Sequence, residues 1–269
     1  MVSDSWRRAR LGLAHPAEGM AADSRLFTKR CSIGSMTLDR RSFLLAASGA
    51  MLPGCASIGG ESGPPAAAPV YRVGDRWVYS ARDGFRLPVT WDETHEVIAI
   101  DAQGIAIRVT QKGETVDNTR IERLSAPGIV VQGALFDSET RRFKTPLTRY
   151  QFPLTPGTHW NQFIGNYDES TKQDGQINNY ASVRGWEKVR VPSGEFDAII
   201  LRVFNHLDDE TFWRYATACN YEIWWSPAAG ASLRENKFAT YREKNQGTFV
   251  VEHRSQNTVL ELTSFRRAT

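Results

Sequence analysis

The densest group of side chains that could do chemistry is the run His206-Leu207-Asp208-Asp209-Glu210. An imidazole beside carboxylates can bind a metal ion or act as a general acid and base, provided that a second histidine or acid converges on it. His159 and His253 are the candidates for that partner. The same run also suits a solvated acidic turn between two strands, which is the interpretation that we favour. Hydrolysis by the His206–Glu210 region remains the alternative.

Known catalytic signatures are otherwise missing from the sequence. His95-Glu96-Val97-Ile98-Ala99 begins like a zinc-protease motif, but Ala99 stands where the second histidine ligand must be. No G-x-S-x-G, S-x-x-K, C-x-x-C, G-x-G-x-x-G or P-loop pattern occurs. We therefore predict no catalytic residue, no metal and no cofactor.

Cys55 closes an ordered N-terminal pattern that begins at Met36. A short stretch with two arginines is followed by an apolar run from Phe43 to Leu52 and then by Pro53-Gly54-Cys55. Basic, apolar and small residues in this order are typical of a secretory signal peptide. The apolar run is about half of the ~20 residues that a membrane-spanning helix needs, so we expect cleavage rather than retention.

Leu52-Pro53-Gly54-Cys55 resembles the lipobox of bacterial lipoproteins. The resemblance implies cleavage between Gly54 and Cys55 and attachment of a diacylglycerol to the Cys55 thiol. Ala56, directly after the cysteine, resembles the residue found in lipoproteins that are sorted to the outer membrane. Each buried methylene adds ~0.8 kcal/mol of membrane affinity, so several acyl chains make a firm anchor.

Arg40 and Arg41 belong to Asp39-Arg40-Arg41-Ser42-Phe43-Leu44, which resembles the twin-arginine export motif. Asp39 departs from the usual Ser or Thr, and the two arginines could also serve only as the positive charge of an ordinary signal peptide. Residues 1–35 lie upstream of any sensible signal start, and we expect them to be a leader that is not native to the protein. Residues 36–54 are then the signal peptide.

Charge and composition limit the partners of the remaining chain. The whole sequence has a formal net charge of +3, but residues 1–54 hold eight Lys/Arg against four Asp/Glu. The remaining residues carry a net charge of −1, which makes nucleic acid an implausible partner. Residues 55–70, rich in Gly, Ala, Ser and Pro, are predicted to be the lipidated cysteine and a flexible tether.

Alternating apolar residues dominate from residue 71 to 269, which we predict to be a single β-rich domain with little helix. Gly104 to Thr110 and Ala198 to Phe204 each place three branched apolar side chains on one face. Thr211 to Trp225, if one continuous strand, puts Trp213, Tyr215 and Trp225 on the core face. Trp224 then points to the other side, where it either packs under a loop or forms the wall of a ligand site.

Two G-x-x-W motifs, Gly74–Trp77 and Gly157–Trp160, suggest two related halves. The turn Val191-Pro192-Ser193-Gly194-Glu195-Phe196-Asp197-Ala198 and the later Trp225–Gly230 run resemble uncharacterised periplasmic β-rich proteins of unknown function. Some of these are similar to the lipoprotein-carrier fold, a curved antiparallel half-barrel around an apolar concavity. The resemblance implies an all-β fold with a curved antiparallel sheet, as a half-barrel or a β-sandwich, and transfers no catalytic residue.

Together these features predict a lipoprotein on the periplasmic face of the outer membrane, held there by its N-terminal lipid. We expect a non-catalytic module that binds an apolar or amphipathic ligand, or an envelope protein, on a concave face. The alternatives are the envelope hydrolase described above and a purely structural or assembly role.

Overall fold

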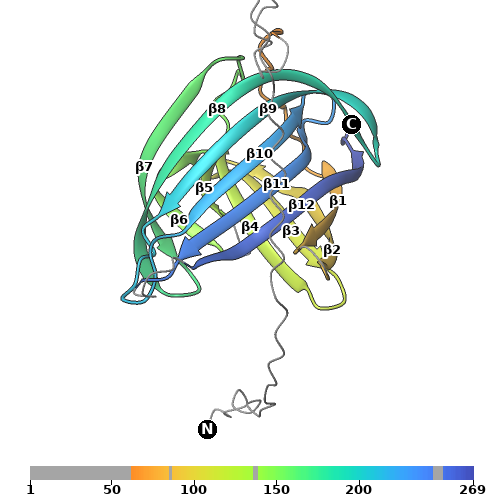
Figure 1. Ribbon diagram of the computed structural model, residues 1–269. Helices are drawn as coiled ribbons and strands as arrows, with labels where there is room; N and C mark the ends of the chain where they lie inside the picture. The colour runs from red at the N-terminus through yellow and green to blue at the C-terminus, as the bar shows by residue number, and fades with distance from the viewer. Residues whose placement is uncertain (1–61, 85–86, 136–138, 245–250) are drawn as a thin grey trace, which may run out of the picture. The chain divides into compact units, whose positions relative to one another are not determined.

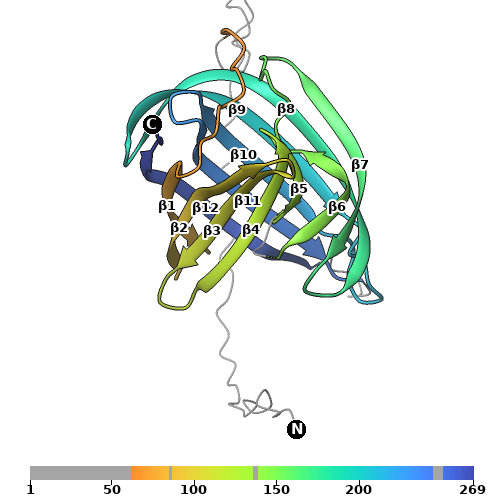
Figure 2. The ribbon, with the colours of Figure 1, turned by 180° about the vertical axis from the view of Figure 1, so that it is seen from behind.

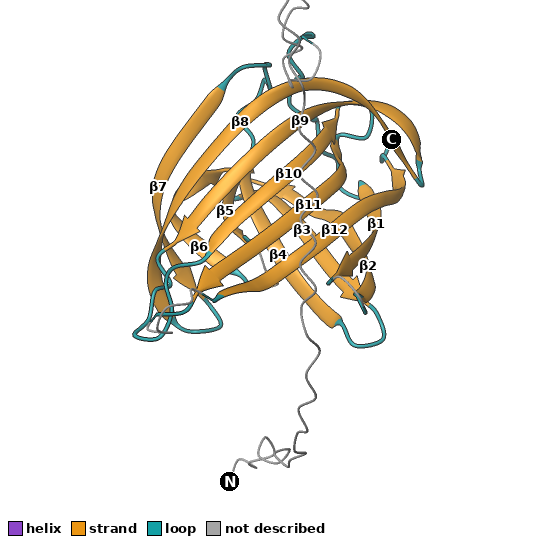
Figure 3. Ribbon diagram, in the orientation of Figure 1, coloured by secondary structure: helices purple, strands orange, loops and turns teal. Residues whose placement is uncertain are grey.

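The computed structural model describes residues 62–84, 87–135, 139–244 and 251–269, and within them every regular element is a β-strand (Figure 3). The strands are β1 Arg76–Asp83, β2 Val89–Asp101, β3 Gly104–Lys112, β4 Asp117–Ala126, β5 Ile129–Gly133, β6 Arg141–Thr148, β7 His159–Asp168, β8 Gln173–Val191, β9 Gly194–Leu207, β10 Ala218–Ser226, β11 Ala231–Arg242 and β12 Glu252–Arg266. The predicted all-β class is confirmed. In this part of the chain, no helix is long and apolar enough to cross a membrane.

The strands form one closed antiparallel barrel (Figure 1). Each strand pairs with its neighbours in the chain, and β1 also pairs with β12. The curved antiparallel sheet is thus as predicted, and its curvature continues past a half-barrel until the first and last strands meet. Closure gives the outer backbone groups of β1 and β12 hydrogen-bond partners, so the sheet has no free edge there. Figure 2 shows the β1–β4 wall from behind.

Local sequence explains the strands and their turns. Ile105 and Val109 of β3 are buried four residues apart, and Ile199 and Leu201 of β9 two residues apart, as expected for strands whose side chains alternate between two faces. The hairpin between β8 and β9 turns at Pro192-Ser193, and Gly194 leaves it with a φ of 137°. Residues with a side chain rarely adopt that backbone conformation, so glycine suits the position.

The prediction for Thr211 to Trp225 is wrong in its first half. The strand β10 begins only at Ala218, and Trp213 and Tyr215 are exposed rather than in the core. Asp209 causes the difference, because its carboxylate accepts hydrogen bonds from the backbone and hydroxyl of Thr217 and from Arg214. These bonds hold the chain in a loop.

The two G-x-x-W motifs occupy corresponding places in the barrel. Gly74 precedes β1 and Gly157 precedes β7, so the motifs stand six strands apart, and both glycines have positive φ. Each tryptophan donates its indole N–H to a distant carbonyl, Trp77 to Ala229 and Trp160 to Thr148. The motif therefore leads into β1 in one case and β7 in the other.

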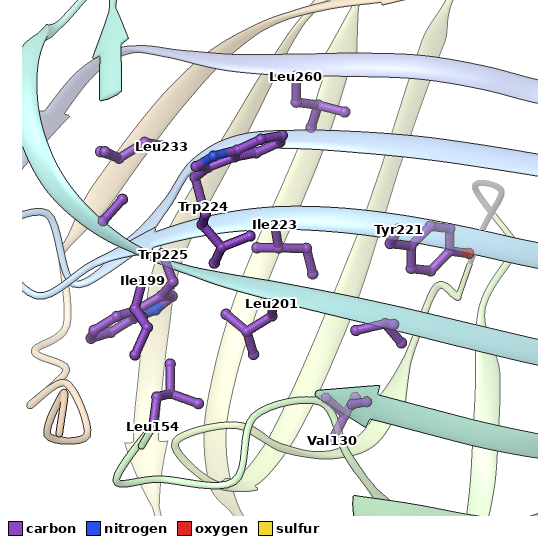
Figure 4. Close-up of a cluster of buried hydrophobic side chains, with 14 of the residues drawn as sticks. Val130, Leu154, Ile199, Leu201, Tyr221, Ile223, Trp224, Trp225, Leu233 and Leu260 are labelled. Atoms are coloured by element: carbon purple, nitrogen blue, oxygen red, sulfur yellow. The ribbon is translucent and has the colours of Figure 1, made fainter. Parts of the chain in front are cut away.

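Twelve strands enclose more space than their own inward side chains fill, since a barrel of about eight strands is already just wide enough for them. Loop segments supply the rest of the packing. Leu154 is fully buried, and Phe152 contacts Trp225 with ring centroids 5.1 Å apart. Figure 4 shows this core, with Trp225 and Leu154 among its residues.

The chain before β1 also packs onto the barrel. Ala66 is buried and exchanges two backbone hydrogen bonds with Leu154, and the carbonyl of Pro64 accepts one from the Trp186 indole. Residues 55–70 are predicted to be a flexible tether, and within that range Pro64 and Ala66 contact the barrel. The Ala- and Pro-rich sequence allows this because small side chains let the backbone approach the sheet closely.

Candidate ligand-binding groove

The barrel interior holds a cluster of charged side chains rather than an open apolar cavity. This ion cluster comes from three strands and one loop segment. It consists of Glu93 and His95 on β2, Arg120 and Glu122 on β4, Arg149 after β6, and Glu235 and Lys237 on β11. His95 Nε2 lies 2.8 Å from Glu93 Oε1, and Arg149 donates a 3.0 Å hydrogen bond to Glu122. The side chains of Arg120 and Glu122 also pair, at 3.3 Å.

These ion pairs determine how the buried carboxyls titrate. Burial alone would raise the pKa of Glu122, but the charges of Arg149 and Arg120 lower it to about 2. Burial would also raise the pKa of Glu93, yet the hydrogen bond from His95 and the charges of His95 and Lys237 lower it well below its ordinary value. The Glu93 and Glu122 carboxyls are therefore ionised at neutral pH, and the neighbouring cationic side chains compensate their charge.

Little room remains within the cluster. The cavity among these side chains measures about 70 Å³, far below the ~300 to 1,000 Å³ of typical small-molecule sites. Arg120 Nη1 and Asn179 Oδ1 line it without a hydrogen-bond partner in the described residues, and the space suits a few water molecules. The apolar concavity implied by the resemblance is thus filled in this structure.

A larger concavity lies on the outside of the barrel, across β7 to β11. This outer groove has a volume of about 710 Å³. The pairing register places five of its residues in one row across five strands, in the order Asn161, Tyr180, Phe204, Asn220 and Phe238. Tyr180 and Phe204 are 48% and 36% exposed, and their ring centroids lie 6.2 Å apart.

A second row of the outer groove is polar. It runs beside the first and contains His159, Ser182, Arg202, Glu222 and Asn236. Arg202 donates a 3.0 Å hydrogen bond to Glu222, so the two formal charges of the row neutralise each other. The outer groove therefore combines exposed aromatic rings with amides and hydroxyls and has little net charge.

Trp224, the predicted ligand wall, lies outside the barrel lumen and is 8% exposed. Its indole N–H donates a 2.7 Å hydrogen bond to Glu187, and the Arg234 guanidinium lies 5.7 Å from its ring. The two adjacent indoles point in different directions from β10, as expected from strand alternation (Figure 4). Trp224 does not line the outer groove.

The His206–Glu210 region forms the end of β9 and the start of the following loop. His206 is exposed, Asp209 is engaged by the loop, and Glu210 pairs with Lys244. His253 instead stacks on Tyr241 and pairs with Glu243, while His159 lies in the outer groove. Among the described residues no group of three or more His, Cys, Asp and Glu side chains could hold a metal.

The predicted lipid site Cys55, the cleavage residue Gly54 and the export residues Arg40 and Arg41 lie outside the described residues. Cys219, in contrast, is buried inside the barrel as its place on the core face of β10 predicts.

Sequence reasoning missed both the ion cluster and the outer groove. Their signal was present in the strand alternation: Glu93 and His95 share a face with the buried Val97, and Arg120 and Glu122 share one with Leu124. Tyr180 and Phe204 alternate out of phase with the buried residues of β8 and β9. The sequence of one strand does not determine its pairing register, and therefore not which residues of the neighbouring strands lie beside it.

Comparison with solved structures finds two matching chains. One is described as a "putative lipoprotein" from Parabacteroides distasonis ATCC 8503, with a TM-score of 0.46 and 10% identity. The other is described as a "putative exported protein with YmcC-like fold" from Bacteroides fragilis NCTC 9343, with a TM-score of 0.45 and 10% identity. Each comparison covers 76% of this chain and 100% of the other. No protein-family model and no curated protein matches the sequence.

Proposed function

We propose that this protein is a lipid-anchored, non-catalytic binding protein of the bacterial envelope, and that it binds its ligand in the outer groove. The anchor is Cys55, and the signal before it directs the domain to the periplasmic face of the outer membrane. Six residues lie between Cys55 and Ser62, so Ser62 stands within ~25 Å of the lipidated cysteine.

The contrast between the lumen and the outer groove carries this proposal. The lumen is filled by ion pairs and inserted segments, with about 70 Å³ left, whereas the outer groove offers about 710 Å³. Solvent-exposed aromatic side chains that gather in one concave place are typical of interaction sites. Tyr180 and Phe204 meet that description because they are neighbours on adjacent strands.

The ligand is amphipathic, since the first row contains three aromatic and two amide side chains. A peptide cannot add to the sheet as a further strand at this place, because β8, β9 and β10 are paired on both sides. Binding in the outer groove must therefore use side chains.

A photo-crosslinker in living cells tests the proposal. In the full-length protein, p-benzoylphenylalanine replaces Tyr180, which keeps an aromatic ring at the position. The matched control replaces Ile100, a 46% exposed apolar residue near the end of β2 and away from the outer groove. We expect an irradiation-dependent adduct at position 180 that is lost when Phe204→Ala and Phe238→Ala are added. Equal labelling at both positions, or none at position 180, would overturn the proposal.

A further inference from the structure

We propose that the ligand of the outer groove is an uncharged glycan chain, an inference that rests on the groove being the binding surface. Four features of the groove point to this class: the spacing of the aromatic rings, the amides in the same row, the neutral charge and the length of the row.

The aromatic rings of the first row are spaced for a chain of rings. Tyr180 and Phe204 lie on adjacent strands, and Phe238 lies two strands beyond Phe204. Strands are ~4.8 Å apart, so Phe238 stands ~10 Å from Phe204. Aromatic faces carry partial negative charge, which attracts the partially positive axial C–H groups of a pyranose ring. Sugar rings joined in a chain repeat over comparable distances.

Two amide side chains stand in the same row as these rings, Asn161 at its end and Asn220 between Phe204 and Phe238. Asn161 and Asn220 are exposed on the same face, and their side-chain amides make no hydrogen bond with the described residues. An amide offers both donors and an acceptor. Sugar hydroxyls likewise donate and accept, so they can satisfy an amide. An acyl chain cannot, and burying the amides beneath one would cost free energy.

The charge of the outer groove favours an uncharged chain. Apart from His159, its charged lining residues are Arg202 and Glu222, which pair with each other. Recognition of phosphate, sulfate or carboxylate uses arginines that are available to the ligand. Here the guanidinium is engaged, and the Glu222 carboxylate would repel an acidic polymer.

The length of the outer groove suits an extended ligand. The first row crosses five strands, from β7 to β11, and so spans ~19 Å. Several sugar units fit along such a row.

The chemical nature of the position-180 adduct tests the inference. Cells that make the full-length protein with p-benzoylphenylalanine at position 180 are irradiated, and the crosslinked tryptic peptide is fragmented in a mass spectrometer. We expect successive losses of neutral hexose or N-acetylhexosamine units. The Asn161→Ala, Asn220→Ala double variant should reduce the adduct at least tenfold, and the matched Arg108→Ala variant on the outside of β3 should leave it unchanged.

The outcomes separate this inference from the proposed function. An adduct that fragments as a peptide, as an acyl chain or as an acidic sugar polymer overturns the glycan inference, while the outer groove remains a binding site. An absence of any adduct at position 180 overturns both. Neutral sugar losses with no dependence on Asn161 and Asn220 also overturn the inference, because the amides would then have no part in recognition.

Discussion

The Nε2 atom of His95 lies 2.8 Å from Glu93 Oε1, inside a barrel in which Glu93 is 3% exposed. Ion pairs at this depth exchange hydration for mutual attraction, and removing one partner leaves the other uncompensated. The ion cluster therefore makes the stability of this barrel sensitive to acid and to single substitutions.

Acid should destabilise the protein through these carboxyls. The folded pKa values of Glu93, Glu122 and Glu235 lie below the ordinary value. The stabilisation is therefore complete above pH ~5 and is lost as the pH falls toward 2. For Glu122 the loss is on the order of 3 kcal/mol. Urea unfolding between pH 7 and pH 3 measures about 2 kcal/mol of this loss, since the rest is lost only as the pH approaches 2. Glu122→Gln should flatten the pH dependence, whereas the exposed Glu195→Gln should not; equal profiles for both would contradict the prediction.

Removing the Glu122 side chain should be costly at neutral pH. Glu122→Ala leaves Arg120 and Arg149 without their shared carboxylate, and we expect a loss of ~3 to 5 kcal/mol in the free energy of unfolding. Glu222→Ala is the matched control, because its pair with Arg202 is solvent-exposed and contributes at most ~1 kcal/mol. Chemical denaturation at pH 7 compares the two variants. A similar loss for both would show that the ion pairs inside the barrel contribute no more to stability than an exposed pair.

Asp209→Ala should release the loop between β9 and β10. The substitution removes the acceptor of three hydrogen bonds, from Arg214 and from the backbone and hydroxyl of Thr217. Phe212, already 88% exposed, should then be cut by chymotrypsin at least several-fold faster. Asp208→Ala, on the exposed neighbour, is the control. Unchanged cleavage in Asp209→Ala would mean that other contacts hold the loop.

Cys55→Ala should move the protein from the membrane fraction to the soluble fraction, because its thiol is the proposed lipid attachment point. Cys219→Ala should leave the protein at the membrane, since Cys219 is buried inside the barrel. Fractionation of cells that express each variant at equal level gives the answer. Retention of Cys55→Ala at the membrane would refute the lipid anchor.

Local pattern predicted the strands where alternation and turn residues agreed. The β3 and β9 runs and the Pro192–Gly194 turn are examples, because a period of two and a backbone with positive φ are properties of a few neighbouring residues. The same pattern misled at Trp213 and Tyr215. Alternating aromatic residues look alike in a strand and in an extended loop, and Asp209 decides between them through contacts up to eight residues away.

The sequence by itself determined the all-β class, the alternation of inward and outward side chains, and the N-terminal pattern that ends at Cys55, because each depends on short-range order along the chain. Only the tertiary structure decided that the sheet closes, that Glu93 and Glu122 meet inside it, and that Tyr180 and Phe204 stand together outside it. Those relationships depend on strand register. Register is set by contacts among all twelve strands, so the sequence of a single strand does not determine it.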